Sequence, residues 1–200
     1  MSKPASTGLA AFLRWLHLYL SLFSFAALFF FAVTGVTLNH ADWFYGDKQQ
    51  TVQCKGQLNV RWVKPAESSN VARLEIVEFL RRTHSVKGAL SDFRVEDSQC
   101  TVSFKGPGYA ADTFINRDTG TYELNETRMG FTAIINDLHK GRDTGRVWSW
   151  MIDVSAILMC LVSLTGLVLV VFLKRRRAAG LAVAVVGTII CYLLYAWWVP

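Results

Sequence analysis

Charged residues are scarce in this chain and unevenly spread. Asp, Glu, Lys and Arg make up 18% of its 200 residues, whereas about 25% is usual for a soluble globular domain. Three stretches carry almost no charge: 18–38, 154–173 and 178–200. Each has the length of about 20 residues that a helix needs to cross a bilayer. This pattern predicts three membrane spans and excludes a soluble enzyme, a collagen, a coiled coil and a disordered chain.

Several familiar motifs are also absent. The chain has no Gly-rich phosphate loop, no Rossmann pattern, and neither a Gly-x-Ser-x-Gly nor a His-Glu-x-x-His motif. We therefore expect that it cannot take hydride from a nicotinamide cofactor by itself. The first apolar stretch ends without a small-x-small cleavage pattern, and it is longer than the h-region of a signal peptide. It is therefore predicted to be a retained helix.

The net charge of +6 reports membrane topology. Residues 39–146 are nearly neutral, with 15 Lys and Arg against 14 Asp and Glu. The other basic residues all flank the spans on one side: Lys3, Arg14, Lys174, Arg175, Arg176 and Arg177. Because basic residues accumulate on the cytoplasmic side, we expect a bacterial inner-membrane protein with a cytoplasmic N-terminus and a periplasmic 39–146 segment. The lipid bilayer is then its partner, and nucleic acid is not.

The predicted domains follow this topology: tail and first helix (1–38), periplasmic domain (39–130), second helix with its lead-in and basic turn (131–177), and third helix (178–200). Within the outer domain, residues 70–83 have helical periodicity with Asn70 as a cap. Turn signals separate four strand-like runs, at 89–95, 100–104, 111–115 and 121–124. The predicted fold class is an α-helical membrane protein with three spans and an inserted α+β domain.

The cysteines leave one alternative open. Cys54 and Cys100 lie in the outer domain, where a periplasmic location permits a disulfide. They are either bonded to each other or two independent, half-buried thiols. Cys160 and Cys191 lie inside spans and are expected to be plain core residues.

Several segments resemble a known family in their order and spacing. They are RWLHLYLSL from Arg14, TGVTLNH from Thr34, FINRDTGTY from Phe114, LHKGR from Leu138 and LTGL from Leu164. Together they resemble PepSY-associated transmembrane proteins over residues 10–177, and the Asp118-Thr119-Gly120 turn resembles that of a PepSY hairpin. Typical members have four spans, and some are iron-uptake reductases that carry two haems. The resemblance thus implies a PepSY-like outer domain, haem b as cofactor and a ferric siderophore as electron acceptor.

Three of the four histidines lie at or near span ends: His17, His40 and His139. Ionisable residues at membrane depth are costly and point to function. His17 and His40 are about 34 Å apart along a helix that rises ~1.5 Å per residue, so they cannot share a metal ion. His40 and His139 lie on the same outer side. They can be the axial ligands of one haem if the second helix starts near Phe131, whereas His84 is expected on the surface of the outer domain.

Haem suits this neighbourhood better than zinc. Zinc needs three or four ligands, and three nearby carboxylates keep it as an alternative: Asp42, Asp137 and Asp143. The aromatic rings around 29–31 and the small pair Thr34-Gly35 offer flat walls and a close helix approach. Arg142 and Arg146 are either partners of haem propionates or solvated interface charges.

Three interpretations of His17 remain open. It binds a second haem together with a ligand from another subunit, it binds a haem together with a non-histidine ligand, or it is a structural residue at the membrane interface. The predicted function is a b-type haem protein that transfers single electrons to a periplasmic acceptor, as a ferric-siderophore reductase or an electron-transfer subunit. Its protein partner would be a second copy or another membrane redox subunit. The alternative is a haem-free, membrane-anchored PepSY module that binds a peptide, a protease or another partner.

Overall fold

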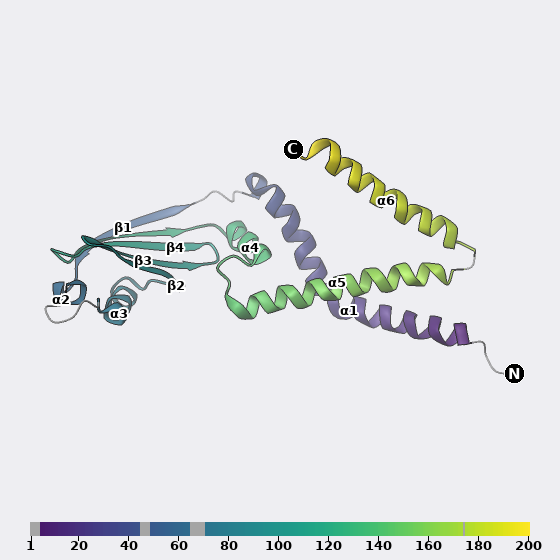
Figure 1. Cartoon of the computed structure of the whole chain (residues 1–200), viewed down its shortest axis with the longest axis horizontal. Helices are drawn as coiled ribbons and strands as arrows, with labels where there is room; N and C mark the ends of the chain where they lie inside the picture. The colour runs from purple at the N-terminus through teal and green to yellow at the C-terminus, as the bar shows by residue number, and fades with distance from the viewer. Residues whose placement is uncertain (1–4, 45–48, 65–70, 174) are drawn as a thin grey trace. The chain divides into compact units, whose positions relative to one another are not determined.

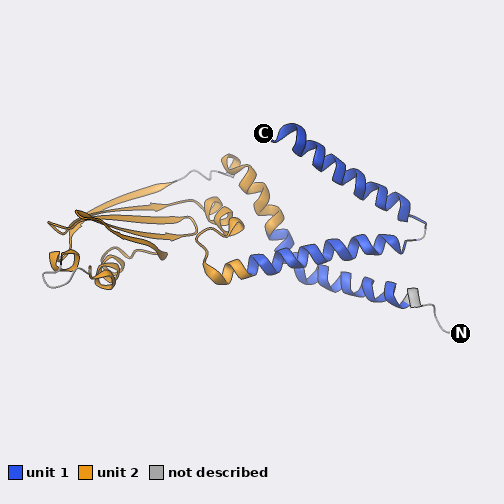
Figure 2. Cartoon of the chain, viewed as in Figure 1, with its two compact units in different colours: residues 1–30, 151–200 blue, residues 31–150 orange. Residues whose placement is uncertain are grey.

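The computed structural model of the chain describes residues 5–44, 49–64, 71–173 and 175–200. It has two compact units, residues 1–30 with 151–200 and residues 31–150 (Figure 2). Helix α1 (Ala5–Asn39) and helix α5 (Gly145–Val171) each contribute residues to both units.

The first unit consists of helical segments long and apolar enough to cross a membrane. Among the described residues there are three such helices, α1, α5 and α6 (Arg177–Trp198) (Figure 1). Most of their large apolar side chains are exposed, and none of the residues of α6 is buried. Helices that are apolar all round and exposed in this way are stable in lipid. The prediction of three membrane spans is confirmed, and the chain is a membrane protein.

The second unit contains a five-stranded antiparallel sheet with the order β1-β5-β4-β3-β2 (Figure 1). The strands are β1 (Gln50–Gln57), β2 (Ala89–Val95), β3 (Gln99–Gly106), β4 (Tyr109–Asn116) and β5 (Thr121–Arg128). The four predicted strands are all present. The edge strand β1 was not predicted, because six of its eight residues are exposed and it lacks an apolar alternation.

One face of the sheet carries the hydrophobic core. The short helix α2 (Val60–Val63) and helix α3 (Arg73–His84) contribute to this core. Ile76 and Leu80 of α3 are fully buried, together with Phe104 of β3 and Leu124 of β5. Truncation of such a side chain to Ala costs about 2–5 kcal/mol. The predicted helix is confirmed, although it begins at Arg73 and its proposed cap, Asn70, lies outside the described residues.

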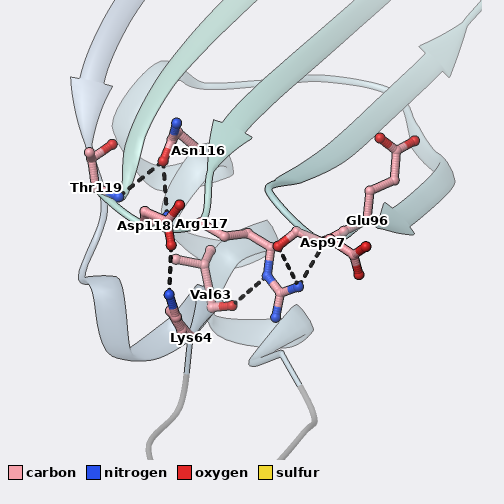
Figure 3. A network of polar contacts seen from close by, with 8 residues as sticks. All are labelled: Val63, Lys64, Glu96, Asp97, Asn116, Arg117, Asp118 and Thr119. Atoms are coloured by element: carbon pink, nitrogen blue, oxygen red, sulfur yellow. Dashed lines mark hydrogen bonds and ion pairs between the residues drawn. The ribbon is translucent and has the colours of Figure 1, made fainter.

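The turn between β4 and β5 is fixed by the side chain of Asn116 (Figure 3). Its Oδ1 accepts hydrogen bonds from the backbone N–H groups of Asp118 and Thr119, at 2.9 and 3.0 Å. Gly120 follows with a φ of 71°, in the left-handed region that favours glycine. The Asp-Thr-Gly signature therefore builds the turn itself.

Arg117 connects this turn to the end of helix α2 and to the turn between β2 and β3 (Figure 3). Its guanidinium group donates to the carbonyl oxygens of Val63, Glu96 and Asp97, at 3.0, 2.8 and 3.2 Å. One cation thus satisfies carbonyl groups that the ends of secondary-structure elements leave without partners. Lys64 forms an exposed ion pair with Asp118 at the same end of the sheet.

The two outer-domain cysteines are not bonded to each other. Cys54 lies in β1 and Cys100 in β3, and β5 and β4 lie between these strands. Three strand spacings separate them by about 14 Å, whereas the Cα atoms of a disulfide lie about 4.4–6.8 Å apart. Cys54 and Cys100 are therefore independent thiols and not a disulfide, and all four cysteines are free. Cys160 and Cys191 are exposed on their helices rather than in a core.

The segment before α5 forms a separate helix, α4 (Phe131–Lys140). The chain then leaves helical geometry, with positive φ values at Gly141, Asp143 and Gly145. The indole N–H of Trp148 donates to the carbonyl oxygen of Leu138 across this break, at 2.8 Å. The expectation that the second membrane helix starts near Phe131 is therefore wrong, because α5 starts at Gly145. It is the separate helix α4 that starts at Phe131 and brings His139 beside Thr34 of α1.

Candidate functional site

Helix α4 lies against the last turns of α1 within the second unit. The buried hydroxyl of Thr37 lies 3.0 Å from Oδ1 of Asn136, and it also donates to the carbonyl oxygen of Thr34. Thr34 and Thr37 are both buried, as are Asn136 and Asp137 of α4. Small and polar residues let two helices approach closely and form hydrogen bonds between them. This contact holds the helix that carries His139.

His139 lies directly against the small pair Thr34-Gly35. Its Nδ1 is 2.7 Å from the hydroxyl oxygen of Thr34. A Cβ atom added to Gly35 would lie 3.7 Å from Cε1 of the ring, so the imidazole lies over the glycine. The ring of Phe31 meets the imidazole edge-on, with centroids 5.4 Å apart. The imidazole is thus fixed by a hydrogen bond at Nδ1 and by packing on its sides.

His40 lies at the end of α1 and has different neighbours. Its ring stacks on Trp43, with centroids 3.7 Å apart and an interplanar angle of 12°. Its Nε2 is 3.2 Å from the side-chain nitrogen of Asn39. His40 follows Thr34 by six residues, about 9 Å along the helix axis. The hydrogen bonds and ring contacts of the described residues do not join His40 to His139, so their pairing on one haem stays a prediction.

Asp137 connects the α4 helix to the sheet. One carboxylate oxygen accepts a hydrogen bond from the backbone N–H of Gly108, in the β3–β4 turn, at 2.9 Å. The other pairs with Arg142 at 2.6 Å, and the Asp137 side chain is only 6% exposed. Arg142 therefore has a carboxylate partner within the protein, whereas Arg146 is exposed in the first turn of α5. A small cavity lies beside this pair, lined by Lys105, Gly106, Tyr109, Ala110, Met129, Asp137, Arg142 and Asp143.

Zinc has no ligand set in the part of the chain that the structure describes. No group of three or more His, Cys, Asp or Glu side chains gathers among these residues. Both carboxylate oxygens of Asp137 already have partners. The zinc alternative therefore receives no support, because zinc sites need at least three protein ligands.

His17 lies in the first unit, where it has a partner of the same kind as His139. Its Nδ1 is 2.8 Å from the hydroxyl oxygen of Thr165 in α5. A Cβ atom added to Gly166 would lie 3.3 Å from its Cε1. His17 thus contacts a Thr-Gly pair on another helix, as His139 does. The sequence contains a signal for this arrangement, because Leu-His occurs twice and the first two apolar stretches each contain one Thr-Gly pair.

His84 was predicted on the surface of the outer domain, and it is only partly exposed there. It is half-buried, and its Nε2 lies 2.7 Å from the hydroxyl oxygen of Tyr122. Burial raises the pKa of Tyr122 above its ordinary value, because low-dielectric surroundings disfavour the charged phenolate. Burial also raises the pKa of the Cys100 thiol. Neither Tyr122 nor Cys100 lies near His17, His40 or His139 in the sequence. We therefore assign Tyr122 and Cys100 to the stability of the outer domain.

Comparison with known protein families identifies the family of this chain. The model of the PepSY_TM-like family matches residues 11–200, which is nearly the whole chain. The comparisons with curated proteins and with solved structures gave no match.

Proposed function

This chain belongs to the PepSY_TM-like family, and from that premise we propose that it is a b-type haem protein that transfers single electrons across the outer part of the bacterial inner membrane. The geometry of His139 is the observation that carries the proposal. Its Nδ1 is held by Thr34 and its ring lies over Gly35. A histidine that ligates a metal through one nitrogen usually forms a hydrogen bond through the other.

Among the described residues, His139 has the geometry of one residue that would hold a haem. His139 has its coordinating nitrogen, Nε2, on the opposite side of the ring from its hydrogen bond to Thr34. Small and aromatic residues, Gly35 and Phe31, surround the imidazole. His40 is the remaining histidine at this end of α1, and it would have to leave Asn39 and Trp43 to help hold a haem.

A haem held by two histidines would supply a one-electron Fe(III)/Fe(II) couple. His139 and His40 would hold it, and Thr34 would orient His139. Asp137 fastens α4 to the sheet and so fixes where His139 lies. Arg146 is exposed and suits a propionate, whereas Arg142 would first have to leave Asp137.

The acceptor that this arrangement suits is a ferric siderophore in the periplasm, beside the outer domain. The positive-inside rule places that domain outside the cytoplasm. Electrons from the cytoplasm must cross about 30 Å of hydrocarbon, too far for one step. A second haem at His17 would shorten this path. Because residues 1–30 and 151–200 contain no other histidine, its second ligand would come from another subunit or from a different residue type.

The test is a visible-absorption spectrum of the purified full chain. We expect a Soret band, α and β bands that sharpen on reduction, and loss of the outer haem in His40→Ala and in His139→Ala. His84→Ala, which removes a histidine from the outer domain, is the matched control and should keep its haem. Anaerobic mixing of the reduced protein with a ferric siderophore should reoxidise it.

Three results would overturn the proposal. A colourless preparation would favour the haem-free PepSY module. A full bis-histidine spectrum in either His40→Ala or His139→Ala would refute that ligand assignment. Loss of the only haem in His17→Ala alone would place the site at the other end of α1.

A further inference from the structure

The two histidines with a threonine neighbour, His17 and His139, share one local geometry. In the first unit, His17 Nδ1 lies 2.8 Å from Thr165 Oγ1, and Gly166 lies under the ring. In the second unit, His139 Nδ1 lies 2.7 Å from Thr34 Oγ1, and Gly35 lies under the ring. In both cases it is Nδ1 that faces a hydroxyl group, and in both the residue after the threonine is glycine. The position of the proton between nitrogen and oxygen therefore matters at both sites.

The single proton of the Thr165 hydroxyl is used in hydrogen bonds to carbonyl oxygens of its own helix. Thr165 Oγ1 lies 2.8 Å from the carbonyl oxygen of Leu161 and 3.0 Å from that of Val162. Two oxygen atoms at such a distance require a proton between them, and a carbonyl group has none to give. A hydroxyl group has only one proton. The contact with His17 must therefore be an N–H group of the imidazole that donates to the threonine oxygen.

The other site has the same Thr-Gly arrangement. The Thr34 hydroxyl also faces a carbonyl oxygen of its own helix, that of Phe31, but at 3.4 Å, beyond the usual range of an O–H···O bond. From the likeness to the Thr165 site, we assign the Thr34 oxygen as the acceptor of a hydrogen bond from His139 Nδ1. In a neutral imidazole, a proton on Nδ1 leaves the lone pair on Nε2. That atom is then free to coordinate a metal.

We propose that Thr34 and Thr165 are positioning residues that hold His139 and His17 in the Nδ1–H tautomer and so reserve both Nε2 atoms for coordination. The use of Nε2 by a haem rests on the function proposed above, whereas the tautomer itself does not. Each threonine sets the ring orientation. Gly166 leaves out a Cβ atom that would crowd the His17 ring, whereas a Cβ atom at Gly35 would make only an ordinary van der Waals contact with His139. The added Cβ atom would lie 3.3 Å from the His17 ring at Gly166 and 3.7 Å from the His139 ring at Gly35. The ring of His17 therefore packs more closely on its glycine than the ring of His139 does.

A simpler reading is that these hydrogen bonds only hold helices together. Thr37 and Asn136 form such a contact without a histidine, 3.0 Å apart. The simpler reading does not specify which nitrogen carries the proton. If the threonine donated to Nδ1 instead, the imidazole would be protonated on Nε2 and could not bind a metal through that atom. The tautomer therefore separates the two readings.

The first test measures the tautomers by ¹⁵N NMR of histidine-labelled full chain in detergent, without added haem. Only four histidines contribute signals, and single His→Ala variants assign them. We expect His17 and His139 to show protonated Nδ1 and unprotonated Nε2. Thr165→Val and Thr34→Val keep the side-chain shape but remove the acceptor, and each should release its own histidine from this tautomer.

Two further variants serve as controls. Thr→Ser at either position keeps the hydroxyl and should restore the Nδ1–H signal. Thr188→Val removes a hydroxyl that donates to the carbonyl oxygen of Ala184 within α6, and it should leave both histidine signals unchanged. If His17 or His139 carries its proton on Nε2 in the unmodified chain, or if the valine variants leave the tautomers unchanged, the proposal is wrong.

The second test uses haem binding. Loss of a hydrogen-bonding partner behind a metal ligand usually costs about 10–100-fold in affinity, so Thr34→Val should lose haem affinity by that factor while Thr34→Ser keeps it. Normal affinity and an unchanged midpoint potential in Thr34→Val would refute the positioning role. A chain that binds no haem but shows both Nδ1–H tautomers would refute the proposed function and leave the tautomer assignment intact.

Discussion

Asp137 offers a sharp test of how the outer domain holds the histidine-bearing helix. Its buried carboxylate accepts from the Gly108 N–H at 2.9 Å and pairs with Arg142 at 2.6 Å. Asp137→Ala would leave the Gly108 N–H without an acceptor, which costs about 1–3 kcal/mol. It would also remove a charge-assisted bond to a half-exposed arginine, which adds about 0.5–1 kcal/mol. We therefore expect a loss of about 1.5–4 kcal/mol in the free energy of unfolding of residues 31–150.

A matched ion pair lies at the other end of the sheet. Lys64 and Asp118 are also 2.6 Å apart, but both side chains are more than 60% exposed. Asp118→Ala makes the same change in charge, and we expect no measurable loss of stability because exposed pairs contribute little. The comparison isolates the effect of burial from the effect of charge.

The assay is chemical unfolding of the detergent-solubilised full chain, followed by tryptophan fluorescence, together with hydrogen exchange at the Gly108 amide. Asp137→Asn keeps an oxygen acceptor and should retain most of the amide protection, whereas Asp137→Ala should lose it. Equal stability of Asp137→Ala and Asp118→Ala would refute the argument that the buried carboxylate fastens α4 to the sheet.

Three other predictions concern the outer domain and the topology. The buried Thr113 hydroxyl has no hydrogen-bond partner among the described residues, so Thr113→Val should raise the free energy of unfolding by about 1–2 kcal/mol; a loss of stability would contradict this. Burial raises the pKa of Tyr122 above its ordinary value of about 10, so the folded domain holds this proton more tightly than the unfolded chain. Stability should therefore fall as the pH rises above about 10, and Tyr122→Phe should show a smaller decline in the same alkaline titration. A reporter enzyme fused after Pro200 should be active only outside the cytoplasm, and activity inside would mean that the number of spans or their orientation is wrong.

Much of the outer domain could be predicted because its signals are local. Strand β2 was predicted with its observed bounds, since alternating residues and flanking turns mark it. Helix α3 was predicted within three residues at its start and one at its end. Strand β1 was missed because an edge strand is held by its pairing with β5, and its own residues carry no apolar pattern. Strand order also decided that Cys54 and Cys100 cannot bond.

The candidate site was predicted only in part. Three histidines near span ends stand out in the sequence because an ionisable group is costly there. The Thr-Gly pairs at 34–35 and 165–166 were visible only as small residues, and their contacts with the histidines were not predicted, because a threonine inside an apolar helix can satisfy its hydroxyl on its own backbone. The break at Gly141 was also missed, although the glycines around it were visible.

The sequence by itself determined that this is a membrane protein with three spans and an inserted α+β domain, because hydrophobicity and periodicity act along the chain. Only the tertiary structure decided which atoms meet. The contacts of His17 with Thr165 and of His139 with Thr34 join residues 148 and 105 positions apart. Such contacts depend on how helices pack and on which nitrogen of a ring faces a neighbour, and neither is encoded in any local stretch of residues.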